Sequence, residues 1–349
     1  MLKFLTLFFY WFVITSAWGL TVPELFRVFG TCDNLYAAPL FIATGNGSAA
    51  TSLDGKTWTV NNNFNWLSLG GHSICYNGNI FVFSDYSVGH CQVFISANGL
   101  TDTSYSDHSD IAWFQTIIWD GTQFLATGAA SSYGRSLWMS SDGITWTEST
   151  TYPNYNPSYG IFYNGNAYVC VGGNSATGGK ISYTTDLTTW TTNTTIFTTC
   201  AYDVCCGNGR WVAVGSGTNT IAYSDDGTTW VGLGTSIFSS QGTSICFDKN
   251  KNRFVAVGWG TNTIAYSDDG ITWVGLGTSI FNSRGTSIFN NGTRFVATGY
   301  YLSNTYGLNT LAYSDDGITW VGLGTSFIGN TTSQSVGGRP CPNAYPSVK

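Results

Sequence analysis

An aspartate followed by glycine recurs along this chain in the pattern Ser-x-Asp-Gly-x-Thr-Trp. The pattern is complete at Ser52–Trp58, Ser140–Trp146, Ser224–Trp230, Ser267–Trp273 and Ser314–Trp320. Thr184–Trp190 keeps the Asp and the Trp but has Leu187 in place of glycine, and Ser96–Thr101 keeps the turn, with Asn98 in place of Asp, and lacks the Trp. Carboxylates that converge could bind a metal ion or act as acids. Carboxylates that stay apart would instead accept hydrogen bonds from the backbone of their own turns.

The spacing of these seven copies indicates which elements position them. Their first residues fall at 52, 96, 140, 184, 224, 267 and 314, so one copy follows another every 40 to 47 residues. Four short strands fit into one such unit, which is the size of a propeller blade. In the sixth unit, alternation and turn residues predict strands over Thr243–Phe247, Arg253–Gly258, Thr263–Ser267 and Thr272–Leu276. No segment shows a sustained helical period.

We therefore expect an all-β chain that forms a seven-bladed β-propeller of four-stranded antiparallel blades. Radial packing of the sheets closes a ring and removes most exposed edges; an open β-solenoid is the alternative. In a ring each carboxylate lies at the periphery of its own blade, so we expect a structural role, with no metal and no cofactor. The residues given this role are Asp54, Trp58, Asp142, Trp146, Asp186, Trp190, Asp226, Trp230, Asp269, Trp273, Asp316 and Trp320.

The motif resembles the Asp-box, or BNR repeat, of sialidases, sortilin-type receptors and photosystem assembly factors, shortened by one residue between Asp and Trp. The resemblance covers all seven units and implies a propeller, but it implies little about function. Its sialidase branch implies a glycoside hydrolase with three arginines, a tyrosine nucleophile assisted by a glutamate, and an acid/base aspartate. The mature chain has only two glutamates, Glu24 and Glu148, and sialidase propellers have six blades. We expect no enzyme, and a hydrolase remains an alternative.

The N-terminus predicts secretion. Lys3 is followed by an apolar run over Phe4–Ile14 and then by small residues, as in a signal peptide over residues 1–19. An uncleaved membrane anchor is the alternative, although the run is shorter than the roughly 20 residues that span a bilayer. We expect the propeller over 20–330, a C-terminal tail over 331–349, and no membrane span after cleavage. Asn-x-Ser/Thr acceptors predict N-glycosylation at Asn46, Asn193, Asn291 and Asn330.

The chain has nine cysteines, an odd number for an oxidising compartment. Cys75, Cys205 and Cys246 fall in equivalent strands of the repeat and are expected to be small buried core residues. The chain begins a blade near Phe26–Gly30 and ends one near Trp320–Leu323. The first and last blades either pack directly against each other or are joined by a Cys32–Cys341 disulfide.

Charge excludes one class of partner. Lys and Arg number 13 against 19 Asp and Glu, and the net charge is −6, so the chain has no electrostatic footprint for nucleic acid. The aromatic content of 16% excludes disorder. Low charge suits self-association, which keeps open a structural subunit of an extracellular coat or filament.

The two faces of the expected ring differ. Loops joining strands 1–2 and 3–4 lie on one face, here called the Asp-turn face, with the recurring Arg210, Arg253 and Arg294. The opposite face carries the 2–3 loops and the connections between blades, and it varies between units. Its longest expected loops are Ser84–His90, Gly128–Arg135, Gly172–Lys180 and Tyr300–Asn309.

Aromatic side chains on the opposite face suit carbohydrate stacking or protein contacts. The candidate binding residues are Tyr86, Tyr133, Arg135, Trp259, Arg284, Tyr300, Tyr301 and Tyr306. They predict an extracellular glycan or protein as the partner; the alternative is that they only cover loop edges. The acidic stretch Asp102–Asp110 is expected to be a solvated loop, with a hard-cation site as its alternative.

Overall fold

The computed structural model describes residues 41–45, 48–61, 73–87, 90–99, 104–130, 135–152, 158–300, 309–327 and 335–338. The chain divides into two compact units, Met1–Ala37 and Ala38–Lys349, and all described residues belong to the second. The predicted signal peptide lies outside the described residues, as do Cys32, Cys341 and the acceptors Asn46 and Asn330. In the described ranges the elements are strands and turns, and no helix is long and apolar enough to cross a bilayer.

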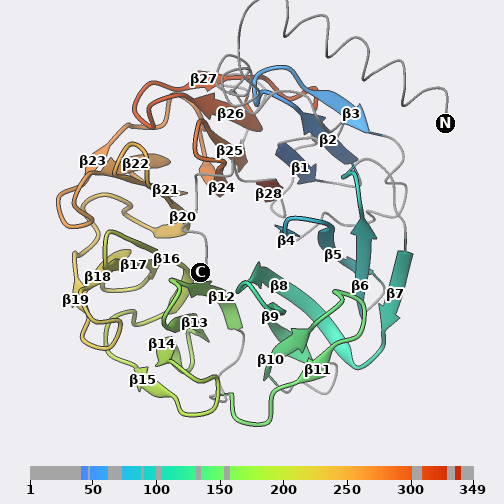
Figure 1. Cartoon of the computed structure of the whole chain (residues 1–349). Coiled ribbons are helices and arrows are strands. Elements are labelled where there is room, and N and C mark those ends of the chain that lie inside the picture. Colours follow the sequence, from blue (N-terminus) through green and yellow to red (C-terminus); the bar gives the residue numbers. More distant parts are fainter. Residues whose placement is uncertain are drawn as a thin grey trace, which may run out of the picture. The chain divides into compact units, whose positions relative to one another are not determined.

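Four antiparallel strands form each blade, and the described residues contain seven blades arranged around an axis (Figure 1). The innermost strands are β28 (Ser335–Gly338), β4 (Ser73–Tyr76), β8 (Ile111–Trp119), β12 (Ser158–Tyr163), β16 (Cys200–Gly207), β20 (Gln241–Asp248) and β24 (Arg284–Asn290). The second strands are β1 (Phe41–Gly45), β5 (Phe81–Ser87), β9 (Phe124–Ala130), β13 (Tyr168–Asn174), β17 (Arg210–Ser216), β21 (Arg253–Trp259) and β25 (Phe295–Tyr300). In this order they define blades 1 to 7.

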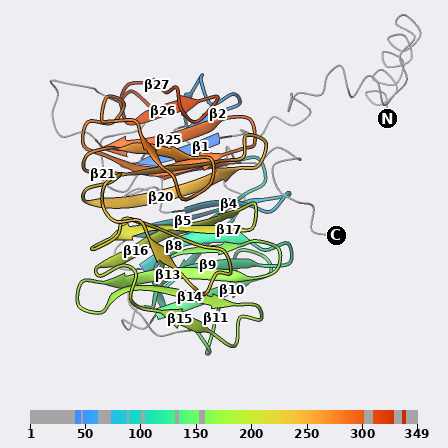
Figure 2. The same cartoon turned by 90° about the vertical axis from the view of Figure 1, so that its left-hand side faces the viewer.

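The outer half of each blade is shorter. The third strands are β2 (Ser48–Ser52), β6 (His90–Ser96), β10 (Arg135–Ser140), β14 (Gly178–Thr184), β18 (Ile221–Ser224), β22 (Ile264–Ser267) and β26 (Leu311–Ser314). The outermost strands are β3 (Thr59–Asn61), β7 (Ser104–His108), β11 (Thr147–Glu148), β15 (Thr191–Asn193), β19 (Val231–Gly232), β23 (Val274–Gly275) and β27 (Val321–Gly322). Seen from the side, the strands run between the two faces of the ring (Figure 2).

Contacts between innermost strands close the ring. β4 contacts β8, and the series continues through β12, β16, β20 and β24 to β28, which contacts β4 again. The predicted fold, a seven-bladed propeller of four-stranded antiparallel blades, is confirmed in the part of the chain that the structure describes.

The last strand in the sequence completes the first blade. β28 pairs antiparallel with β1, with Ala43 opposite Val336 and Phe41 opposite Gly338. This strand lies in the segment 331–349 that sequence analysis assigned to a tail, so the propeller extends beyond residue 330. Blade 1 is thus built from two distant parts of the chain. The first and last strands of the propeller pair within this one sheet. The Cys32–Cys341 pairing lies outside the described residues.

The core lies between successive sheets. The second strands are the most deeply buried, and Phe41, Phe81, Phe124 and Phe295 at their starts are fully buried. Because each aromatic side chain contacts the next sheet as well as its own, neighbouring blades share one apolar layer. Seven such layers hold sheets that are only four strands wide.

Three segments that were expected as loops are strands. Most of Ser84–His90 belongs to β5 and β6, and Gly172–Lys180 is the β13–β14 hairpin. The acidic stretch contributes Ser104–His108 to β7, the outermost strand of blade 2. In β5 the polar Ser84 and Asp85 are buried in an inner strand, whereas β7 lies at the outer edge of its blade, where polar side chains are tolerated.

Candidate functional site

The carboxylate of each repeat motif is engaged by its own turn. In blade 7, Asp316 Oδ1 accepts hydrogen bonds from the backbone N–H groups of Ile318 (2.8 Å) and Thr319 (2.7 Å). Ser314 Oγ accepts from the N–H of Gly317 at 2.7 Å, and Trp320 Nε1 donates to the carbonyl of Gly317 at 3.2 Å. We call this arrangement the Asp-turn. It uses the motif's polar groups to close a hairpin.

The bonds to the carboxylate recur in the other copies that have an aspartate. Carboxylates accept two backbone N–H groups at Asp54, Asp142, Asp186, Asp226 and Asp269. Gly317 has a φ of +78°, and Leu187 holds the equivalent position in blade 4 at +60°, a conformation that costs a side chain about 1 kcal/mol or more. In blade 2, Ser96 Oγ donates to Asn98 Oδ1 in place of the carboxylate. The turn therefore survives replacement of the glycine by leucine and of the aspartate by asparagine.

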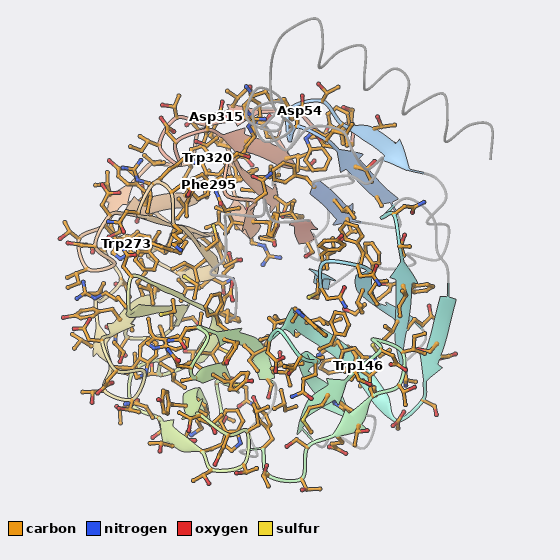
Figure 3. All side chains as sticks on the ribbon, viewed as in Figure 1. Asp54, Trp146, Trp273, Phe295, Asp315 and Trp320 are labelled. Carbon is orange, nitrogen blue, oxygen red and sulfur yellow. The ribbon has the colours of Figure 1, made fainter. Side chains whose placement is uncertain are left out.

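The indoles of the motif lie away from the ring axis, as the labelled Trp146, Trp273 and Trp320 show (Figure 3). Trp58, Trp146 and Trp230 are buried, whereas Trp190, Trp273 and Trp320 are partly buried. No group of three Asp, Glu, His or Cys side chains in the described ranges is placed to hold a metal ion.

An arginine links each Asp-turn of blades 5 to 7 to the next blade. Arg253 binds both carboxylate oxygens of Asp268 in its own blade (2.7 and 3.1 Å) and donates through Nη1 to the carbonyl of Asp316 in blade 7 (2.7 Å). Arg210 makes the same contacts from blade 5 to blade 6. These bonds, together with stacking over Tyr266 and Tyr223, show that the recurring arginines hold adjacent turns together.

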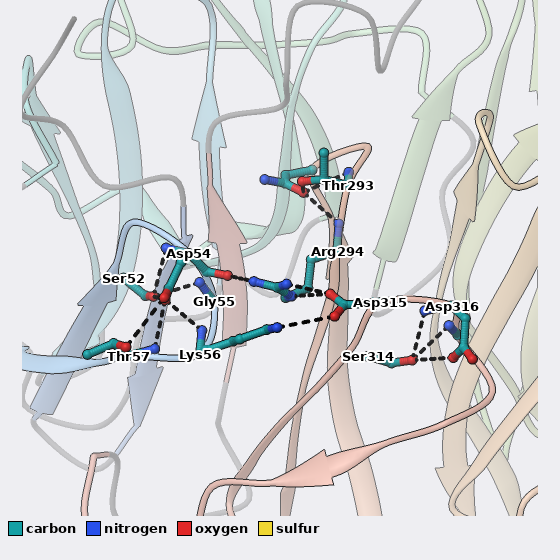
Figure 4. A network of polar contacts seen from close by, with 12 residues as sticks. Ser52, Asp54, Gly55, Lys56, Thr57, Thr293, Arg294, Ser314, Asp315 and Asp316 are labelled. Carbon is teal, nitrogen blue, oxygen red and sulfur yellow. Dashed lines mark hydrogen bonds and ion pairs between the residues drawn. The ribbon is translucent and has the colours of Figure 1, made fainter. Parts of the chain in front are cut away.

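The third arginine spans the junction where the ring closes. Arg294 of blade 7 binds Asp315 and donates to the carbonyl of Asp54 in blade 1 (Figure 4). Lys56 of blade 1 reaches back to Asp315 Oδ2 at 3.3 Å. The Asp-turn face is therefore occupied by structural contacts over these blades.

Three candidate binding residues come together on the opposite face. The sheets of blades 5 to 7 join end to end there because Ser216 pairs with Gln241 and Trp259 pairs with Arg284 across blade boundaries. Tyr300 pairs with Arg284 within blade 7. One row of directly paired residues therefore crosses six strands, in the order Cys200, Ser216, Gln241, Trp259, Arg284 and Tyr300. We call it the rim row.

The centre of the rim row is aromatic and cationic. Trp259 is 44% exposed and is the only exposed tryptophan in the described ranges. The Arg284 guanidinium carbon lies 5.7 Å from the centroid of the Tyr300 ring, within cation–π range. Side chains of directly paired residues are close neighbours, so Trp259, Arg284 and Tyr300 form one patch.

A glycine beneath the row permits this close approach. Gly258 precedes Trp259, and a Cβ on it would lie 2.6 Å from the ring of Phe238. Phe238 is fully buried and belongs to the connection between blades 5 and 6. Ser240, two residues later, donates its N–H to the carbonyl of Trp259 at 3.1 Å. The small residue and the anchored connection together fix where the exposed indole sits.

The bulged innermost strand of blade 5 brings one more side chain, Tyr202, near this patch. Tyr202 lies at the bulge in β16, and its ring packs edge-to-face on Tyr159 with the centroids 5.2 Å apart. Burial lowers the pKa of Arg284, and its electrostatic interactions with Tyr300 and Tyr202 oppose this effect. The phenols of Tyr300 and Tyr202 are therefore both within electrostatic range of Arg284.

Sequence analysis missed Asp203, which follows Tyr202 and faces the next blade. Its Oδ2 accepts hydrogen bonds from Ser244 Oγ (2.9 Å) and the Ile245 N–H (3.0 Å), and its Oδ1 accepts from the Val204 N–H. Burial, only partly offset by these bonds, raises its pKa to about 6. The sequence did contain a signal for Asp203. Blades 6 and 7 have a serine at the same strand position, Ser244 and Ser287, so an aspartate there departs from the repeat.

The structure does not describe the side chains of the remaining candidates. Tyr86 and Arg135 lie on β5 and β10, and their side chains fall outside the described part. Tyr133, Tyr301 and Tyr306 lie outside the described residues altogether.

Of the two acceptors that the structure describes, only Asn193 is accessible. Asn291 is 1% exposed, and its Oδ1 accepts the N–H groups of Thr293 and Arg294, so a glycan there would require the turn to open. Asn193 is partly exposed at the end of β15. The structure therefore disfavours the prediction for Asn291.

The seven cysteines in the described ranges form no disulfide bond. Cys75 and Cys205 are buried as predicted, and Cys246 is partly buried. Burial raises the pKa of each of these three thiols, so they remain protonated at neutral pH.

Comparison with known proteins identifies the fold. Neither a protein-family model nor a curated protein matches this chain. The β-propeller domain of Myceliophteria thermophila Cps50 (Swd1) superposes with a TM-score of 0.52 at 11% identity, covering 74% of this chain and 90% of that one. The WD40 β-propeller domain of Doa1 superposes with a TM-score of 0.53 at 9% identity, covering 75% of this chain and 87% of that one. Virginiamycin B lyase from Staphylococcus aureus superposes with a TM-score of 0.57 at 12% identity, covering 73% of this chain and 84% of that one. At these identities the likeness shows the fold alone: the chain is a β-propeller.

Proposed function

We propose that this chain is a secreted, N-glycosylated, non-enzymatic recognition module that binds an extracellular glycan or protein at the rim row. The observation that carries the proposal is the side-by-side placement of Trp259, Arg284 and Tyr300 on the opposite face. Trp, Tyr and Arg are the residue types that dominate binding energy at recognition surfaces. Large flat rings also stack on sugars and partners without losing much conformational entropy.

The arrangement of carboxylates supports binding rather than catalysis. Most glycoside hydrolases need two carboxyl groups facing one bond, and the sialidase arrangement needs a glutamate and an acid/base aspartate beside its tyrosine. The Asp-turn carboxylates are each held by their own turn, and Asp203 is held by Ser244 and Ile245. These groups serve the scaffold, so the proposed function relies on the exposed rings.

The test uses a substitution that copies another blade. In blade 5, Ser216 occupies the rim position that Trp259 occupies in blade 6, so Trp259→Ser should fold. We expect the wild-type chain to bind members of a glycan array or an extracellular protein panel, and Trp259→Ser to bind at least about ten-fold more weakly. Val274→Thr, on the outer edge of the same blade, is the control and should bind as the wild type does. Equal binding by Trp259→Ser would contradict the proposal.

A second candidate function, a structural subunit of a coat or filament, rests on a different surface. Val231, Val274 and Val321 lie on the outermost strands of blades 5 to 7 and are 47%, 45% and 45% exposed. Exposed apolar edge strands can pair with another chain. This candidate predicts concentration-dependent assemblies in light scattering that disappear when all three valines are replaced by lysine. A monodisperse monomer at high concentration would exclude it.

A further inference from the structure

Two copies of the repeat differ where the rim row passes. Thr218–Ile245 and Thr261–Ile288 are identical except at Thr228/Ile271, Ser239/Asn282 and Gln241/Arg284. Ser239 and Asn282 lie in the connection to the next blade on the opposite face, and Gln241 and Arg284 are the first residues of the innermost strands that follow. The scaffold thus accepts either glutamine or arginine at one rim position, and blade 7 has the arginine.

The surroundings of Arg284 are suited to an anion beside a flat ring. It is directly paired with exposed Trp259 on one side and with Tyr300 on the other. Burial lowers its pKa, so a negative charge brought to the guanidinium would offset the cost of desolvation. A carboxylate fits the planar guanidinium with two parallel hydrogen bonds.

We propose that Arg284 determines specificity by selecting glycans that carry a carboxylate, with the sugar ring against Trp259. This inference rests on the proposed function. Gln241, which is directly paired with Trp259 in the rim row, offers its amide group to the hydroxyls of a sugar. A protein segment with several acidic residues fits less well, because Arg284 is the only cationic residue of the rim row.

The variant that tests this role is Arg284→Gln, which gives blade 7 the residue that blade 6 already has at this position. The probes are a panel of uronate-bearing oligosaccharides and the same panel after reduction of the carboxyl groups. We expect the wild-type chain to bind at least one acidic probe about ten-fold more tightly than its reduced form. Arg284→Gln should bind the two forms equally, at the level of the reduced form. Asn282→Ser, the neighbouring difference between the copies, should keep the preference.

The other outcomes separate this inference from the function on which it rests. If Arg284→Gln keeps the preference, or if the wild type binds both forms equally, the role of Arg284 is wrong while glycan recognition stands. If the wild type binds a protein partner in a Trp259-dependent manner and no glycan, the glycan class is wrong and the recognition face stands. If nothing binds and Trp259→Ser changes nothing, both proposals fail.

Discussion

Arg294 in blade 7 donates a hydrogen bond through Nη1 to the backbone carbonyl of Asp54 in blade 1, 240 residues away in sequence. The same link joins blade 5 to blade 6 through Arg210 and blade 6 to blade 7 through Arg253. At the closing junction it acts alongside the β1–β28 pairing. Two independent contacts, one between side chain and backbone and one between strands, therefore hold the ends of the ring together.

Arg294→Ala should destabilise the fold. It removes charge-assisted hydrogen bonds to Asp315 and Asp54, and because Asp315 is 56% exposed the loss should be about 1–3 kcal/mol. Urea unfolding measures this loss. Arg253→Ala should cost a similar amount, and Lys249→Ala, which removes an exposed cation from the same face, should have little effect. Identical stability of Arg294→Ala and the wild type would contradict the role of the link.

Alanine substitutions at two glycines of blade 7 distinguish the cost of backbone strain from the cost of steric crowding. Gly317 and Gly324 both have positive φ, +78° and +75°. A Cβ on Gly317 would lie 2.9 Å from Val255 Cγ2, whereas one on Gly324 would have no neighbour within 4 Å. We expect Gly324→Ala to cost about 1 kcal/mol and Gly317→Ala about 2–4 kcal/mol. Thermal unfolding of both variants measures the two losses of stability. The loss in Gly317→Ala should be the larger, and an equal or smaller loss would contradict the crowding around Gly317.

The Asp-turns should make stability sensitive to acid. Burial raises the pKa of Asp269, but hydrogen bonds from Thr272, Ile271 and Ser267 outweigh it and hold the pKa at about 2. A folded-state pKa below the ordinary 3.8 gives stability that is present above pH 3.8 and is lost as the pH falls toward 2. Asp269→Asn removes this titration, so its deficit against the wild type should be largest above pH 4 and should shrink by pH 2. A deficit independent of pH in urea unfolding would contradict this.

Asp203 should act in the opposite direction at higher pH. Its pKa of about 6 in the folded state lies above the ordinary 3.8, so its stabilising effect is complete below pH 3.8 and is lost as the pH rises through 6. Stability should fall between pH 4 and pH 7 by on the order of 2–3 kcal/mol. In Asp203→Asn this dependence should be absent. Thermal unfolding of the wild type and Asp203→Asn between pH 4 and pH 7 tests this. If stability changes with pH in the same way in both proteins, the raised pKa of Asp203 is contradicted.

The fold could be predicted from the sequence because each blade carries its own local signal. Turn residues at a fixed spacing mark the third hairpin of every blade, and the number of copies sets the number of blades. The role of Arg253 was partly readable too, because Ser-Asp-Asp-Gly in the same blade supplies Asp268 as its partner.

The missed features depend on contacts between distant segments. β28 has the sequence Ser-Val-Gly-Gly, which has a weak strand signal, and it becomes a strand because β1 offers an unpaired edge. The rim row forms across blade boundaries, where pairing depends on how the sheets meet. Asp203 reaches its partners through a bulge whose position depends on the strand register.

Pairing of β28 with β1 completes the first blade, and an engineered disulfide tests this closure of the ring directly. Ala43 and Val336 are paired residues of β1 and β28, so the full-length variant Ala43→Cys/Val336→Cys should form a bond under mild oxidation. Mass spectrometry of a non-reducing digest should show the peptides containing residues 43 and 336 linked through these two positions. The control pair Ala43→Cys/Val321→Cys, which places one cysteine on outermost strand β27, should not link. Absence of the 43–336 link, or equal linking in the control, would show that the C-terminal strand does not complete the first blade.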